Sequence, residues 1–86
     1  MTLSRADIFS RLASAIEGDT GESLTNVNEK TSIREDLGMD SVDVIGAVNS
    51  IERELHIRLT TQDISKFITL GDVVDVIERE VSKDVR

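Results

Sequence analysis

The sequence lacks cysteine, proline, tryptophan and tyrosine, and it contains only two phenylalanines and one histidine. Without cysteine there is no disulfide framework, no thiolate nucleophile and no cysteine-based zinc site. Without proline, no pyrrolidine ring forces a helix to break. Because aromatic side chains are nearly absent, the core must be built from Ile, Leu, Val and Ala.

Long apolar runs and basic segments are also missing. No stretch approaches the roughly 18 apolar residues that a transmembrane helix needs, and no basic segment followed by an apolar run marks a signal peptide. We therefore expect a cytosolic protein without a membrane span. Positive charge is scarce, since 10 Lys and Arg face 17 Asp and Glu, for a net charge of −7. A polyanionic nucleic acid would repel such a chain, so nucleic-acid binding is not expected.

The residues that are present have a globular composition, with 38% hydrophobic and 31% charged residues. A chain of 86 residues is expected to form a single domain over residues 1–86. It buries only about 60–65% of its unfolded surface and has little room for a deep catalytic cleft. The charge is uneven: residues 34–56 hold six acids against two arginines, more than half of the net charge.

The first helix is predicted between a capping box at Ser4 and Asp7 and a closing glycine at Gly18. Its apolar stripe recurs with the period of an α-helix and consists of Ile8, Phe9, Leu12, Ala13 and Ile16. Residues 18–33 are rich in turn formers and lack helical periodicity. We predict a long loop there, anchored by its isolated apolar residues Leu24, Val27 and Ile33. Loops longer than about 12–15 residues tend to be functional or mobile.

The second helix is predicted after Asp40, which can cap it, with Asp43 in the acidic position of a capping box. Its stripe, which Ile45 widens, consists of Val44, Val48, Ile51 and Leu55. A short helical turn is predicted over residues 60–64.

The last helix is predicted after a Thr69/Asp72 box, with a stripe of Leu70, Val73, Val74, Ile77 and Val81. Its β-branched residues favour a strand over 72–77 as an alternative. That segment lacks strict alternation of apolar and polar residues, so the helix is preferred. The chain should therefore be all-α, a small irregular antiparallel four-helix bundle with three main helices, one short helix and a long first loop.

Two candidate sites have ordinary explanations. His56 is the only histidine, so it forms neither a metal site nor a triad, and its position suits the end of the second helix. Asp36, Asp40 and Asp43 suggest a cation site, but Gly38 stands where a calcium loop needs a ligand. A solvated acidic face is the simpler interpretation.

Ser41 follows the loop and opens the second helix. A serine at such a boundary is usually a cap, but Asp40 already fills that role. A hydroxyl in the first turn can point to solvent beside unpaired backbone N–H groups. A phosphate on that oxygen would meet the positive end of the helix dipole.

Residues 33–77 resemble the acyl carrier proteins. The signature is Leu37-Gly38-Met39-Asp40-Ser41, followed by Val42-Asp43. The runs over residues 51–55, 57–59 and 67–73 are similar to the end of the family's second helix, its exit segment and the entry to its last helix. The motif matches cover about half of the chain.

This resemblance implies that Ser41 receives 4′-phosphopantetheine from coenzyme A, through a phosphopantetheinyl transferase. The thiol of the arm then holds an acyl group as a thioester, so the protein is a carrier and not an enzyme. A chain without cysteine fits an imported thiol. Partner enzymes with basic patches would dock on a monomer whose candidate docking residues are Asp40, Val42, Asp43, Ile45 and Glu52, with Asp40 and Asp43 helping to engage the transferase.

Three positions and one loop depart from the family pattern. Gly46 stands where an acid is common, Asn49 replaces an apolar contact, Thr60 replaces a proline, and the loop over residues 18–32 is longer than expected. These departures predict a specialised carrier in lipid or secondary-metabolite biosynthesis. Two alternatives stay open: an aminoacyl or D-alanyl carrier, and an unmodified acidic module that binds a basic protein. Whether an acyl chain folds back between the helices is also open.

Overall fold

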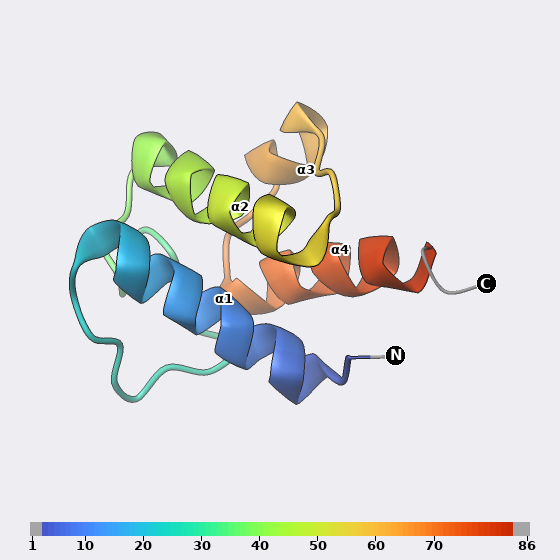
Figure 1. Cartoon of the computed structure of the whole chain (residues 1–86). Coiled ribbons are helices and arrows are strands. Elements are labelled where there is room, and N and C mark those ends of the chain that lie inside the picture. Colours follow the sequence, from blue (N-terminus) through green and yellow to red (C-terminus); the bar gives the residue numbers. More distant parts are fainter. Residues whose placement is uncertain (1–2, 84–86) are drawn as a thin grey trace.

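Four helices form the protein in the computed structural model, which describes residues 3–83. They are α1 (Arg5–Thr20), α2 (Ser41–Leu55), α3 (Thr61–Ser65) and α4 (Leu70–Lys83). In Figure 1 the short α3 lies beside α2, and a long connection runs between α1 and α2. The predicted all-α architecture is confirmed, and the segment 72–77 lies inside α4 rather than in a strand.

An aliphatic core joins the helices. α1 packs against both α2 and α4. The two phenylalanines are only partly buried against this core. The interior therefore consists of the predicted aliphatic residue types with one addition, Met39. The buried hydrophobic residues are Ile8, Leu12, Ile16, Ile33, Met39, Ala47, Val48, Ile51, Ile57, Leu59, Leu70, Val73, Val74 and Ile77.

Each helix begins with a capping box of the same design, in which the cap side chain accepts a hydrogen bond from the backbone of an aspartate three residues later. That aspartate accepts in return from the backbone of the cap. Such caps each stabilise a helix by about 1 kcal/mol. The four pairs are Ser4/Asp7, Asp40/Asp43, Thr60/Asp63 and Thr69/Asp72.

The end of α1 differs from the prediction. The helix continues past Gly18 to Thr20, and Gly21 closes it in the left-handed conformation with a φ of 76°. The N–H of Gly21 donates to the carbonyl of Glu17 over 2.8 Å. The prediction at Gly18 was wrong because two glycines three residues apart both fit a helix end, and the closing hydrogen bond forms at the second one.

The connection over residues 21–40 is held by the start of α4. The N–H groups of Leu70 and Gly71 donate to the carbonyls of Thr31 (3.1 Å) and Glu29 (2.8 Å). The N–H of Ile33 donates to the carbonyl of Ile68 over 2.9 Å. The first N–H groups of a helix have no partner inside the helix, so these loop carbonyls satisfy two of them. Ile33 is buried, and the other predicted anchors, Leu24 and Val27, are half-buried.

Arg5 ties the same loop to two helices by charge. Its guanidinium, at the start of α1, pairs with Glu29 of the loop and with Asp75 and Glu78 of α4, the last two over 2.8 and 2.9 Å. These hydrogen bonds raise the pKa of Arg5 and lower that of Glu29. Partly exposed ion pairs add little stability singly, so the backbone hydrogen bonds remain the main link between the loop and α4.

Gly71 is required by the closeness of the loop. A Cβ at this position would lie 2.9 Å from the carbonyl oxygen of Glu29. We expect Gly71→Ala to lower the free energy of unfolding by about 1–3 kcal/mol, because the backbone of the loop must shift. Gly18→Ala is the matched control, since nothing lies within 4 Å of its Cβ position inside α1. It should raise stability by up to about 1 kcal/mol. Urea unfolding measures both changes, and a loss of the same size in the two variants would contradict this explanation.

Candidate functional site

Ser41 is the first residue of α2, and its side chain is exposed, as the sequence predicted. The preceding Asp40 caps the helix: its Oδ1 accepts from the N–H of Asp43 over 2.9 Å, and its own N–H donates to Oδ2 of Asp43 over 3.3 Å. Among the described residues, none hydrogen-bonds the hydroxyl of Ser41. The two aspartates therefore satisfy each other and leave this hydroxyl facing solvent.

A tight turn before α2 fixes the direction in which Ser41 points. The N–H of Gly38, which has a φ of 65°, donates to the carbonyl of Arg34 over 3.0 Å. The N–H of Met39 donates to the carbonyl of Ile33 over 3.1 Å, and the Met39 side chain is buried in the core. A left-handed backbone favours glycine. Gly38 thus allows the turn, Met39 anchors it inward, and the cap and Ser41 follow on the surface.

Ser41 lies at the edge of a hollow of about 460 Å³. One wall comes from the start of α2 and the turn before it, and the other comes from α3 and the segment that leads to α4. A hollow of this size falls in the range of small-molecule sites. Its lining residues are Ser32, Ile33, Arg34, Glu35, Met39, Asp40, Ser41, Val44, Ile45, Ile64, Ser65, Phe67 and Ile68.

Among the described residues, three large apolar side chains are exposed, and two of them, Ile45 and Ile68, line this hollow. Val42 is 73% exposed, Ile45 47% and Ile68 68%. Val42 and Ile45 were predicted as docking residues. Ile68 was not predicted as a docking residue. Its position before the Thr69/Asp72 box, outside the apolar stripe of the last helix, could have indicated that it is exposed. The exposed apolar surface of the hollow therefore comes from Ile45 of α2 and from Ile68 at the entry to α4.

The other predicted docking residues lie in different environments. Asp40 is exposed and Asp43 is half-buried, each engaged in the capping box. Glu52 lies farther along α2, where its Oε2 accepts from the N–H of Leu59 over 2.8 Å. Glu52 therefore also fixes the segment after α2. The structure does not bring it to the hollow beside Ser41.

Two departures from the family pattern have a structural reason. A Cβ at Gly46 would lie 2.5 Å from a carboxylate oxygen of Asp19, at the end of α1. A larger residue there would have to displace the exposed side chain of Asp19, because α1 brings this acid against α2. Thr60 caps α3 through its hydroxyl, which a proline could not do. The contact with Asp19 could not be foreseen, because the prediction from sequence ended α1 at Gly18, before Asp19.

The interior leaves little space for a ligand. The void between α1, α2 and α4 measures about 20 Å³, close to the room needed by one water molecule. An acyl chain could enter only if the helices moved apart. Its lining residues are Leu12, Ile16, Ile33, Met39, Val44, Ala47, Val48, Leu70 and Val73.

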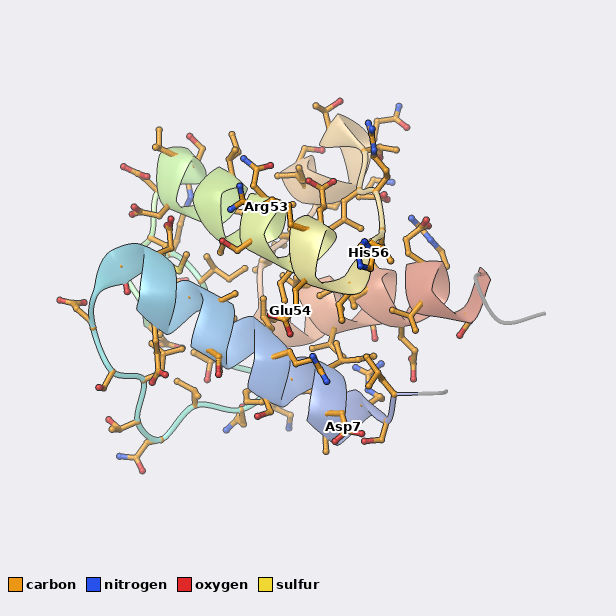
Figure 2. The ribbon with its side chains drawn as sticks, in the orientation of Figure 1. Asp7, Arg53, Glu54 and His56 are labelled. Atoms are coloured by element: carbon orange, nitrogen blue, oxygen red, sulfur yellow. The ribbon has the colours of Figure 1, made fainter. Side chains whose placement is uncertain are left out.

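The far end of α2 provides no catalytic cluster. Figure 2 shows Arg53, Glu54 and His56 on the last part of this helix, away from its start. His56 closes α2 with a φ of 56°, and Glu54 pairs with Arg11 of α1 over 2.7 Å. Within residues 3–83, no three His, Cys, Asp or Glu side chains gather as metal ligands. None of the described helices is both long and apolar enough to cross a membrane.

The comparisons with known proteins identify the family. Residues 10–77 match the family model for the phosphopantetheine attachment site. The chain belongs to this family. It is therefore a carrier that bears a phosphopantetheine arm and not an enzyme. A curated acyl carrier protein of Thermotoga maritima is 35% identical over 78 residues, which are 91% of this carrier and 96% of the relative.

Two solved structures are similar to the carrier. The crystal structure of an acyl carrier protein from Thermotoga maritima has a TM-score of 0.84 and 28% identity, over 92% of each chain. The solution structure of a 3,5-dioxohexyl acyl carrier protein, from the actinorhodin polyketide synthase of Streptomyces coelicolor, has a TM-score of 0.71. It covers 99% of the carrier and 98% of that chain at 16% identity, so it supports the fold alone.

Asp72 positions the outer wall of the hollow. Its Oδ2 accepts from the N–H groups of Ile68 (2.9 Å) and Thr69 (3.0 Å). The hydrogen bonds from the N–H groups of Thr69 and Ile68 lower the pKa of Asp72, because they favour its ionised form. The exposed Ile68 is thus held in place by a carboxylate of α4.

The link between Asp72 and Ile68 predicts a pH dependence of stability. At neutral pH, Asp72→Ala should lower the free energy of unfolding by about 1 kcal/mol, as the loss of a cap does. An acid whose pKa is lowered by folding stabilises the fold above its unfolded pKa of about 3.9. The difference in free energy of unfolding between wild type and Asp72→Ala should therefore be largest above that pH. It should decrease as the pH falls through the lowered pKa of Asp72 in the folded protein. Urea unfolding at several pH values measures it. Asp72→Asn, which keeps an oxygen acceptor but cannot ionise, is the control, and a difference that does not change with pH would contradict the assignment.

Proposed function

We propose that Ser41 is the residue to which the phosphopantetheine arm is attached. The observation that supports this is its free, exposed hydroxyl at the start of α2, beside a hollow lined by apolar and polar groups. A long flexible arm needs an attachment oxygen that an enzyme can reach and that no neighbouring group occupies. Ser41 meets both conditions.

The start of α2 also suits the product of the modification. In the transfer, Oγ of Ser41 forms a bond to phosphorus and loses its proton, while adenosine 3′,5′-bisphosphate leaves coenzyme A. The resulting phosphodiester carries one negative charge close to the positive end of the helix dipole. Asp40 and Asp43 are hydrogen-bonded to each other's backbone, so neither carboxylate takes the hydroxyl of Ser41 as a partner.

Carriers of this family interact with phosphopantetheinyl transferase and with acyl-processing enzymes. We propose that these partners dock on the first half of α2, where Val42 and Ile45 expose apolar surface beside the capping acids Asp40 and Asp43. Glu52 would add negative charge farther along the helix. Buried apolar anchors with a charged rim are typical of transient interfaces, and acidic residues would steer a basic partner surface toward Ser41. The monomeric state and the cytosolic location stay predictions.

Attachment at Ser41 is tested by intact mass after incubation with coenzyme A and a broad-specificity transferase. We expect a gain of one phosphopantetheine in the wild type and none in Ser41→Ala. Ser65→Ala is the matched control, because Ser65 is also exposed and lines the same hollow, and it should be modified like the wild type. Modification of Ser41→Ala, or a wild type that always stays bare, would disprove the assignment.

We further propose that the carrier serves a particular synthase or ligase in lipid or secondary-metabolite biosynthesis. The support is the altered partner face, where Gly46 takes the place of a side chain and Asp19 of α1 lies against it. A partner shaped for an acid on α2 itself would meet a different surface. An aminoacyl or D-alanyl carrier would have the same fold and the same serine chemistry, and the enzyme that loads the thiol distinguishes it.

Complementation measures this specialisation. We expect the carrier to restore growth only partly, or not at all, in a strain that lacks its general fatty-acid carrier. The mass of the protein recovered from that strain shows whether it carries the arm, so that a missing modification is distinguished from poor recognition. Full replacement of the general carrier would disprove specialisation.

A further inference from the structure

Arg34 is the one cationic residue among the described residues that line the hollow beside Ser41. Its side chain is exposed, and no carboxylate of the described residues pairs with it. The guanidinium groups of Arg5, Arg11 and Arg79, in contrast, each have a carboxylate partner. Arg34 thus brings an exposed, unpaired positive charge to the lining of the hollow that Ser41 shares.

The backbone that holds Arg34 is well fixed. Its carbonyl accepts from the N–H of Gly38, and the neighbouring Ser32 donates its N–H to Oδ2 of Asp36 over 2.7 Å. The N–H of Ile33 is bound to the carbonyl of Ile68 across the hollow. The guanidinium therefore extends from a rigid turn, and less freedom is lost when it binds a second group.

The charges around Ser41 explain why a cation is useful there. Glu35 and Asp40 line the same hollow, and both would repel a phosphodiester on Ser41. A guanidinium matches phosphate oxygens with two parallel hydrogen bonds. Arg34 offsets the repulsion and supplies the hydrogen-bond donors that the two acids lack.

Building on the proposed attachment at Ser41, we propose that Arg34 binds the phosphodiester of the arm and directs the arm across the hollow toward Ile68. The arm has a dimethyl group next to its phosphate and two amides before its thiol. The opposite wall offers apolar contacts from Ile45, Phe67 and Ile68 and a hydroxyl from Ser65. Ile68, 68% exposed without the arm, would become covered. Because the arm is tethered at the edge of the hollow, its local concentration is high and weak contacts suffice to hold it.

The test uses the modified protein, in the wild type and in Arg34→Gln and Arg34→Lys. NMR measures the ³¹P shift of the phosphodiester and the nuclear Overhauser effects between the methyl groups of the arm and those of Ile68. A partly exposed ion pair increases the ratio of docked to undocked arm by about two- to fivefold. We therefore expect Arg34→Gln to weaken the contacts with Ile68 by that factor and to move the ³¹P shift toward its value in free pantetheine phosphodiesters. Arg34→Lys should retain part of the effect, since lysine keeps the charge but not the paired hydrogen bonds.

Arg53→Gln is the matched control. Arg53 lies near the end of α2 (Figure 2), twelve positions after Ser41, which corresponds to about 18 Å along the helix. That distance exceeds the screening length of about 8 Å at physiological salt. Arg53→Gln thus removes one positive charge, as Arg34→Gln does, and should leave the arm's contacts with Ile68 and its ³¹P shift unchanged.

Mass spectrometry of each sample separates the two proposals. If the arm is attached to Ser41 but its contacts with Ile68 and its ³¹P shift are equal in wild type and Arg34→Gln, the proposed role of Arg34 is wrong and the attachment at Ser41 still holds. A wild type that never gains the arm overturns both. High salt should weaken the contacts with Ile68 in the wild type more than in Arg34→Gln, and equal salt dependence would also count against Arg34.

Discussion

The hydrogen bonds between residues 29–33 and the start of α4 hold the functional end of the molecule together. Leu70 and Gly71 donate to the loop, Ile33 donates back to Ile68, and Gly71 has no side chain to keep the two backbones apart. These contacts place the turn before α2 opposite the segment that enters α4. The two walls of the hollow beside Ser41 are therefore a consequence of one backbone pairing that needs a glycine.

The proposed attachment residue, Ser41, is exposed because neighbouring residues divide the structural tasks at the start of α2 among themselves. Gly38 makes the turn, Met39 anchors it in the core, and Asp40 caps the helix with Asp43 as its reciprocal partner. The hydroxyl of Ser41 has no hydrogen-bond partner within residues 3–83. Because each neighbour satisfies its own polar groups, the exposed hydroxyl costs the fold little stability.

The interior and the surface of the carrier offer different possibilities to a bound cargo. The void between the long helices is about the size of a water molecule, whereas the hollow at the start of α2 measures about 460 Å³. A small aliphatic core without buried aromatics can yield, but separating its helices exposes apolar surface to water. The open hollow requires no such rearrangement, and Arg34 and Ile68 at its two sides suit a phosphodiester and an apolar segment, respectively.

The sequence by itself determined the helices, their capping boxes and the identity of Ser41 as the candidate residue, because these depend on residues three or four positions apart. Its local signals could not choose between Gly18 and Gly21 as the end of α1, since either glycine fits a helix end. Only the tertiary structure brought Asp19 against Gly46, and Arg34 and Ile68 to the hollow of Ser41. Asp19 and Gly46 are far apart in the chain, as are Ser41 and Ile68, and no local periodicity encodes contacts that arise when separate helices and a long loop pack on one core.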